Sequence, residues 1–412
     1  MKEDFKQSIF DLKKNDPKGI LKIEKLINII ADHKYLEEIK AAFNIDSTKD
    51  EKIVIENIDS AFFGIKNINE KYEKLNIIAE TEFVSTQMVD PIEKVVDFIF
   101  EEGRVDDELV EGLRAEAIYE ARNTFLDEYK MSKYANNLYE KGFDSLVEYN
   151  INFFKELAKE KKQYNKKRSY RLLKKNEKYF LRGITSEKYN EYGIDFTFFV
   201  TVMLLHLQMK QNKGNSYSIV SLSISESKLD MIIKNNRILT VKDFGQVSLA
   251  IKVSTNELGK GSLNVTSAIR VQGNNAEQSL YLFPKERKHL ETKRIINHIS
   301  SLKNVFSKLE DFETVFNISD EFVEDIKDIK GIKHPDELRS KIQRKIEHPN
   351  SAFKSFKELK DIFKPNIKNA IDNFSALLQM CMKAEDLDIE YELKEKLRYI
   401  ISDIILYGNS QN

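Results

Sequence analysis

Apolar positions recur at helical spacing through the first 163 residues. Ile20, Ile23, Leu26, Ile27 and Ile30 fall on one helical face, and Val95, Val96, Phe98 and Ile99 follow Pro91 in the same way. Residues 106–129 and 143–162 carry similar apolar stripes, and Ser132 is a suitable cap for a helix between them. The pattern predicts a helical N-terminal region over residues 1–163.

The apolar period changes near Ser169. Two runs, 170–173 and 179–184, flank the turn-forming Lys175-Asn-Glu and predict a β-hairpin. Period-2 alternation places Tyr170 and Lys174 on one face of that hairpin and Arg171 on the other. An apolar helix is expected at 195–211. Strands rich in Ser, Thr, Val and Ile are expected at 216–225, 229–234, 247–255, 263–271 and 279–283.

Helical patterning returns from Lys288, with breaks at Gly331, Pro335, Pro349 and Pro365. His334-Pro335 and His348-Pro349 each precede an apolar-periodic stretch, so both prolines are expected at a first helical position. The expected fold is α+β, with a mixed, mostly antiparallel β-rich core domain (164–287) between helical N-terminal (1–163) and C-terminal (288–412) regions.

Composition narrows the class of protein. The 412 residues are 41% hydrophobic and 32% charged, which suits a folded core rather than disorder. The single cysteine, Cys381, excludes a disulfide framework and a cysteine-based metal cluster. The N-terminus is too charged for a signal peptide, and the most apolar run, 196–209, is too short to cross a bilayer. A cytoplasmic, soluble protein without membrane contact is expected.

Charge is distributed unevenly along the chain. Residues 1–150 hold 21 basic and 33 acidic side chains, whereas residues 155–188 hold 13 basic and four acidic ones. Lysine and arginine neutralise phosphates, and tyrosine rings offer faces on which unpaired bases stack. The candidate nucleic-acid contacts are Lys161, Lys162, Tyr164, Lys166, Lys167, Arg168, Tyr170, Arg171, Lys174, Lys175, Tyr179, Arg182, Lys260 and Arg270.

The same basic segment has two other interpretations. It can be a solvated lysine-rich helix end that runs into an ordinary strand, or a docking surface for the acidic N-terminal region, which would then gate it.

A glycine-containing loop, residues 255–262, joins two of the predicted strands. Gly259 and Gly261 suit positive φ, and the backbone amides around Lys260 can form an anion-binding concavity. A plain hairpin turn explains the loop equally well. Gly-Lys-Gly-Ser is not a P-loop, because that motif needs Ser or Thr directly after the lysine and a following helix.

The core pattern resembles an uncharacterised phage- and plasmid-borne protein family, over residues 168–285 only. The family shows Arg-x-x-x-Ser-x-x-Tyr, then Ser-Glu-x-Gly-x-x-Ser-Leu, then an arginine and a Cys-x-Asn-Gly element. The matching positions are Arg182, Ser186, Tyr189, Glu257, Gly259, Ser262, Leu263, Arg270 and Asn275, whereas Gly273 and Ala276 replace the family's Cys and Gly. The resemblance implies a setting of mobile elements and DNA handling, and no defined chemistry.

Catalytic constellations are largely absent. No two of the six histidines are spaced for helical zinc binding, and no nucleophile elbow or dinucleotide fingerprint occurs. Glu226 and Lys228 form half of a restriction-type nuclease motif, but the nearest upstream carboxylate candidate, Asp195, is some thirty residues back on a predicted helix. His206 is expected to pack in the core. We therefore assign no catalytic residue, metal or cofactor.

Three functions stay open. The first is a non-catalytic nucleic-acid-binding protein of phage, plasmid or antiviral-defence origin that binds single strands or DNA ends through the basic hairpin. The second is an oligomeric interaction or scaffold protein that binds an acidic protein partner. The third is a metal-dependent nuclease that uses Glu226 and Lys228.

Overall fold

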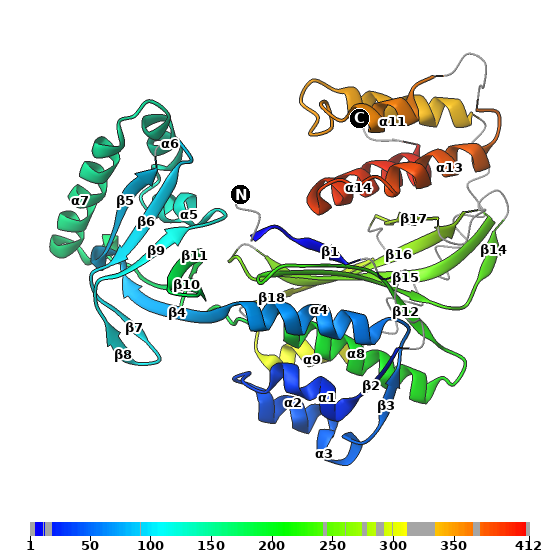
Figure 1. Cartoon of the computed structure of the whole chain (residues 1–412), viewed down its shortest axis with the longest axis horizontal. Coiled ribbons are helices and arrows are strands. Elements are labelled where there is room, and N and C mark those ends of the chain that lie inside the picture. Colours follow the sequence, from blue (N-terminus) through cyan, green and yellow to red (C-terminus); the bar gives the residue numbers. More distant parts are fainter. Residues whose placement is uncertain are drawn as a thin grey trace.

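The computed structural model describes residues 5–10, 12, 19–90, 92–241, 245–259, 261–273, 278–285, 292–298, 300–310, 334–365 and 371–408, and confirms the α+β class. Two eight-stranded, mostly antiparallel sheets dominate (Figure 1). We call them the central sheet and the lateral sheet. A two-stranded ribbon, β2 (Ile20–Lys22) with β3 (Lys52–Val54), accompanies them.

The central sheet has the strand order β1-β12-β13-β15-β16-β17, with β14 beside β15 and β18 beside β16. Its strands are β1 (Ser8–Phe10), β12 (Tyr217–Ile224), β13 (Lys228–Asn235), β14 (Leu239–Val241), β15 (Gly245–Asn256), β16 (Ser262–Gln272), β17 (Ser279–Leu282) and β18 (Lys293–Asn297). The five strands predicted between residues 216 and 283 are confirmed. The strand β18 was expected to be helical, and this expectation was wrong because its pairing with β16 decides its conformation.

The lateral sheet has the order β5-β6-β9-β11-β10-β4-β7-β8. Its strands are β4 (Glu73–Glu80), β5 (Val84–Asp90), β6 (Val95–Phe100), β7 (Gly103–Val105), β8 (Glu108–Val110), β9 (Leu113–Ala117), β10 (Lys167–Lys175) and β11 (Lys178–Thr185). The predicted hairpin is confirmed as β10–β11. Because β10 also pairs with β4 along its length, the sheet crosses the expected domain boundary at 163/164.

The prediction that residues 1–163 are helical is therefore wrong in part, because this region also contributes strands to the lateral sheet. Residues 95–100 form a strand in which alternate side chains are buried, Val96, Phe98 and Phe100 among them. Residues 106–129 form β8, β9 and only then a helix. The short apolar windows fitted both periods, and pairing with neighbouring strands selects the extended form.

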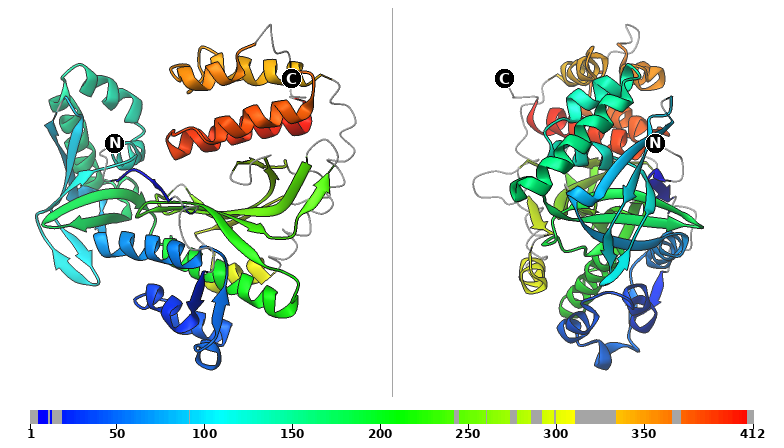
Figure 2. Two further views of the ribbon diagram at one scale, coloured as in Figure 1. Left: turned by 45° about the vertical axis from the view of Figure 1, so that its right-hand side comes forward. Right: turned by 90° about the vertical axis from the view of Figure 1, so that its left-hand side faces the viewer.

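Helices cover both faces of the central sheet (Figures 1 and 2). On one side lie α4 (Ile58–Lys71), α8 (Gly193–Gln211) and α9 (Leu302–Glu310), with α1 (Ile23–Ile27), η3 (Asn28–Ile30), α2 (Leu36–Phe43) and α3 (Ile45–Thr48) beneath them. The helix α8, predicted at 195–211, is apolar on all sides and almost wholly buried, as expected of a helix enclosed by other elements.

On the opposite side lie the C-terminal helices α11 (Pro335–Glu347), α12 (Lys357–Phe363), α13 (Phe374–Glu385) and α14 (Tyr391–Tyr407). Pro335 occupies the first turn of α11, as predicted. Pro349 does not begin a helix, since residues 349–356 form turns before α12. The predicted break at Gly331 lies outside the described residues.

The outer face of the lateral sheet carries α5 (Ala121–Glu128), α6 (Ser132–Glu140) and α7 (Asp144–Glu160), followed by the short η5 (Lys162–Tyr164). A single 3-10 turn, η4 (Thr81–Phe83), separates β4 from β5. The predicted helix at 143–162 is confirmed as α7, and Ser132 begins α6. In the described part of the chain, no helix has the length and apolarity that crossing a bilayer requires.

Candidate functional site

The centre of the predicted basic segment is neutralised by the protein's own carboxylates. Arg168 binds Glu128 with two nitrogens, at 2.8 and 3.0 Å, and Lys166 Nζ lies 2.7 Å from the same carboxylate. Burial disfavours the charged form of Glu128, but the two cations outweigh it and lower its pKa. Lys167 pairs with Glu187 at 2.8 Å.

Farther along the hairpin, the cations are also occupied. Lys174 lies 3.7 Å from Glu73 and above the ring of Tyr179. Lys175 is half-buried with contacts of its own. On the central sheet, Arg270 is buried and its Nε donates to Ser279 at 2.9 Å. Lys260 lies outside the described residues.

Three further candidate contact residues are buried. Tyr170 is fully buried with its ring edge-on to Phe100, 5.1 Å between centroids, and Arg171 and Arg182 are 2% and 1% exposed. The expectation that they contact nucleic acid is therefore corrected. Helices cover one face of the hairpin and the central sheet approaches the other, so alternation exposes neither face.

The remaining candidates lie together at the end of α7. Lys161 and Lys162 are exposed, and Tyr164 is 37% exposed. Within the described residues, neither lysine has an ion pair. Among the described residues, these three are the part of the predicted basic surface that is accessible and is not neutralised by the protein's own carboxylates.

Arg171 and Arg182 instead form a buried charge cluster with Glu191 and Glu257. Arg182 Nη2 binds Glu191, and Arg171 Nη1 lies 3.4 Å from Glu191 Oε2 and 3.7 Å from Glu257 Oε2. Glu257 Oε1 also accepts from the backbone N–H of Gly193 at 3.1 Å. The cluster joins β10 and β11 of the lateral sheet to the loop after β15 of the central sheet.

The two carboxylates of this cluster have opposite pKa shifts. Burial and repulsion by Glu191 raise the pKa of Glu257 to about 7. For Glu191, attraction to Arg182 and Arg171 outweighs burial and holds the pKa well below its usual range. Beside them, burial lowers the pKa of His298 to about 4, and its ring stacks on Tyr189 at 4.6 Å. The cluster therefore holds one ionised carboxylate and one that titrates near neutrality.

Several residues that carry the family resemblance meet at this cluster. Arg182, Tyr189 and Glu257 belong to it, and Gly259, with φ +89°, brings the loop against Ile184 and Thr185. Ser262 and Arg270 lie elsewhere, on β16. Three of the positions quoted for the resemblance thus lie at a buried junction of the two sheets, and of these only Arg182 had been predicted as a surface contact.

The half-motif Glu226 and Lys228 does not form a joint site. Glu226 is buried and accepts from Tyr119 at 2.7 Å and from Ser227 at 2.9 Å, whereas Lys228 pairs with Glu392 at 2.6 Å. In the described chain, no group of three or more His, Cys, Asp and Glu side chains is placed to hold a metal ion. His206 is buried, as expected, and bonds to Glu51 at 2.9 Å.

An exposed apolar face on α7 escaped the sequence analysis. Leu146, Tyr149 and Phe153 follow Phe143 at helical spacing, and each is exposed, Tyr149 by 69% and Phe153 by 57%. The opposite side of the helix, with Val147 and Ile151 at its centre, packs on the lateral sheet. The sequence does contain a signal for this exposed face, because the apolar residues of α7 fall on both sides of the helix.

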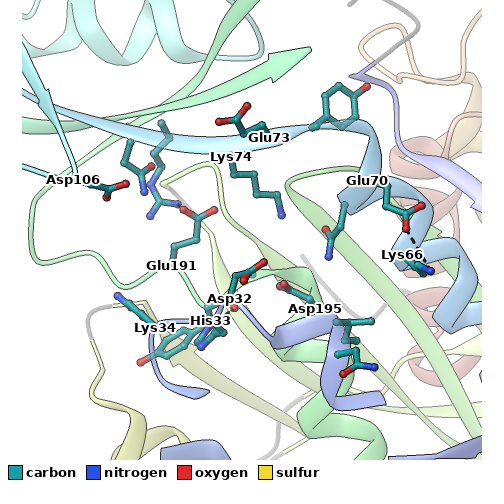
Figure 3. Close-up of a pocket in the computed structure, with 18 of the residues that line it drawn as sticks. Asp32, His33, Lys34, Lys66, Glu70, Glu73, Lys74, Asp106, Glu191 and Asp195 are labelled. Atoms are coloured by element: carbon teal, nitrogen blue, oxygen red, sulfur yellow. Dashed lines mark hydrogen bonds and ion pairs between the residues drawn. The ribbon is translucent and has the colours of Figure 1, made fainter. Parts of the chain in front are cut away.

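A cavity of about 960 Å³ opens where the lateral sheet meets the helices under the central sheet (Figure 3). Its walls come from α1, η3 and α4 on one side, and from β4, β10 and the segment before α8 on the other. Arg171 and Glu191 of the buried cluster reach its surface.

Comparison with known proteins does not identify a relative of this chain. No protein-family model, no curated protein and no solved structure matches it.

Proposed function

We propose that this chain is an interaction protein that associates with a second copy of itself through the exposed apolar face of α7. This proposal keeps the oligomer of the scaffold alternative that the sequence left open, but replaces its acidic protein partner with a second copy of the chain. One observation carries the proposal: Leu146, Tyr149 and Phe153 form a continuous apolar stripe on the outer side of a helix whose inner side is already packed.

Exposure of such an apolar stripe to water is unfavourable in free energy. Contiguous apolar patches on soluble proteins mark surfaces that bind partners, and aromatic side chains dominate the energetics of protein interfaces. Figure 1 places α7 at the outer edge of the molecule, beside the lateral sheet and away from the central sheet. Within the part of the chain that the structure describes, the exposed face of α7 is therefore accessible to a partner helix.

Charges at the two ends of the stripe favour a second copy as the partner. Lys141 precedes the N-terminal end of α7 and Glu160 closes its C-terminal end, and both side chains are exposed. In an antiparallel pair about a two-fold axis that passes between Tyr149 and Phe153 on the exposed face, Tyr149 of each copy meets Phe153 of the other. Glu160 of each copy then comes beside Lys141 of the other. A self-complementary patch of this kind is what an isologous dimer requires.

Light scattering after size-exclusion chromatography tests the proposal. We expect a dimer mass for the wild type and a monomer mass for the double variant Tyr149→Glu, Phe153→Glu. Ile92→Glu is the matched control, because Ile92 is 88% exposed but distant in sequence from α7. It should leave the dimer intact. A monomeric wild type at high micromolar concentration, or a double variant that remains dimeric, overturns the proposal.

Nucleic-acid binding is the second candidate, favoured by Lys161, Lys162 and Tyr164 at the end of α7. Exposed lysines beside an exposed ring suit unpaired nucleotides, for which phosphate neutralisation and stacking supply the affinity. A mobility-shift titration with single-stranded DNA and RNA at low salt tests it. We expect binding that weakens with salt and is lost in Lys161→Glu, Lys162→Glu, with Lys133→Glu as the control. The absence of any shift at low salt removes this candidate.

A further inference from the structure

The cavity at the junction of the lateral sheet and the helices has the size of a ligand site. Its volume of about 960 Å³ is at the upper end of that of small-molecule pockets, roughly 300–1,000 Å³. Charged, polar and apolar residues all contribute to the walls. Ile29, Phe62 and Tyr72 supply the apolar surface.

The buried cations and carboxylates of the cavity floor are already paired with one another. Arg171 pairs with Glu191 and Glu257, and its guanidinium stacks on Tyr189 at 4.2 Å. The Nδ1 of His33 accepts from the N–H of Tyr35 at 3.2 Å, and its Nε2 lies 3.0 Å from the carbonyl oxygen of Tyr192. Because Nδ1 accepts a hydrogen bond and burial lowers the pKa of His33, the ring is neutral. These groups shape the floor and leave recognition of a ligand to others.

Three charged groups that matter for a ligand lie on opposite walls. Lys74 projects from β4 on one side, whereas Asp32 and Asp195 lie on the other, as Figure 3 shows. None of the three has an ion pair with another described residue, although Lys74 lies close enough to Glu191 to help lower the pKa of that carboxyl. Lys66 and Glu70, at the cavity's side, pair with each other at 3.4 Å.

Two buried polar atoms of the cavity lining also lack a partner. They are Asn69 Oδ1 and the hydroxyl of Tyr189. Buried polar atoms are nearly always hydrogen-bonded in folded proteins, so such groups at a cavity wall indicate contacts that a ligand or water would complete.

We infer that this cavity binds a zwitterionic amino acid or short peptide, with its ammonium group at Asp32 and Asp195 and its carboxylate at Lys74. The two opposite charges on facing walls match a ligand that carries both. Asn69 and Tyr189 would bind its amide or carboxylate atoms, and the apolar wall would cover its side chain. This inference is independent of the α7 face and goes beyond the proposed self-association.

Other ligand classes fit the walls less well. A nucleotide or other polyanion is disfavoured because the lining has no excess of positive charge: it holds the cations Lys25, Lys34, Lys66, Lys74 and Arg171 and the carboxylates Asp32, Glu70, Glu73, Asp106, Glu191 and Asp195. A polyamine would leave Lys74 facing a like charge. An uncharged ligand would leave all three unpaired groups desolvated without a counter-charge, which is unfavourable.

Thermal-shift and calorimetric titrations with the common free amino acids and trialanine, at millimolar concentration, test the inference. The tightest binder is then compared with its N-acetylated and C-amidated forms. Because hydrogen bonds to charged groups are the stronger ones, we expect each blocked form to bind about tenfold more weakly or worse. Failure of every probe to bind, or blocked forms that bind as well as the parent, overturns the inference.

Substitutions locate the site on the protein. Lys74→Gln and Asp32→Asn should each weaken binding about tenfold, since each removes one charged contact and both positions are accessible enough to fold normally. Lys133→Gln and Asp46→Asn, on exposed positions outside the cavity, are the matched controls and should bind as wild type. Unchanged binding in both cavity variants would show that the probe binds elsewhere and would contradict the inference.

Discussion

Arg182 and Ser227 join the two large sheets: Arg182 Nη1, on β11, donates to Ser227 Oγ, in the turn between β12 and β13, at 2.8 Å. The same hydroxyl donates to Glu226, which also accepts from Tyr119. With its other terminal nitrogen, Arg182 binds Glu191 ahead of α8. One fully buried guanidinium thus links the lateral sheet, the central sheet and the cavity wall.

Replacing Arg182 by methionine should destabilise the protein severely. Loss of the guanidinium leaves Glu191 with only the more distant Arg171 and strips the Ser227 hydroxyl of a donor. Breaking a buried ion pair from one side costs about 3–5 kcal/mol. Urea unfolding should show a correspondingly lower midpoint. Arg104→Met, at an exposed position of β7, is the control and should change the unfolding free energy by less than about 0.5 kcal/mol.

Glu257 should make stability fall as pH rises through neutrality. Its folded pKa of about 7 exceeds its ordinary value of 4.5, so the folded state holds the proton more tightly. The stabilisation is full below the ordinary pKa and is lost as pH rises through about 7. The groups facing this carboxylate are Glu191, Arg171, Arg182 and His298.

Glu257→Gln isolates this contribution, since the amide oxygen can still accept from Gly193. We expect the stability of the wild type relative to this variant to fall between about pH 5 and pH 8. His298, whose folded pKa is lowered, acts in the opposite direction below pH 6.5 and cancels in the comparison. Urea unfolding at several pH values measures the difference. A difference that is constant with pH, or that rises, would contradict the assigned pKa.

How far the sequence predicts this fold depends on the range of the interactions involved. The β10–β11 hairpin, α8 and the long strands of the central sheet were predictable, because each has a clear period and local turn residues. The segment at 95–100 was not. Its six residues fit either period, and only pairing with β5 and β9 makes them a strand.

The candidate site was less predictable, because its charges are paired over long separations. Glu128 lies some forty residues before Arg168 in the chain, and Glu257 lies far beyond Arg171. Alternation correctly separated Tyr170 from Arg171, yet both are buried because both faces of the hairpin are covered. A local excess of lysine and arginine therefore could not reveal which cations reach solvent.

The Glu128 contact is testable through Glu128→Gln. The variant loses the paired contact to Arg168 and the contact to Lys166, both partly shielded from water. We expect a loss of about 1–2 kcal/mol, less than for a fully buried pair because solvent screens these groups. The lowered pKa of Glu128 means that the wild type's advantage is present above its ordinary pKa and declines as pH falls below it.

The matched control for that variant is Glu187→Gln. Glu187 pairs with Lys167, and both side chains are about half exposed, so its loss should cost less than about 0.5 kcal/mol. Denaturant unfolding of the two variants gives the comparison directly. Equal effects would mean that the Glu128 contacts contribute no more than an ordinary surface pair.

Gly259 offers a test of how closely the two sheets approach. Its φ of +89° is a conformation that alanine adopts only with strain, and an added Cβ would lie 3.0 Å from Thr185 Cγ2 and 3.2 Å from the carbonyl oxygen of Ile184. Gly259→Ala should therefore cost about 1–3 kcal/mol, and it should displace the loop that carries Glu257. Gly214→Ala is the control: no atom lies within 4 Å of its added Cβ, so stability should be unchanged or slightly higher. If both variants unfold like the wild type, the β15–β16 loop does not contact the end of β11, and the buried charge cluster is not a junction between the sheets.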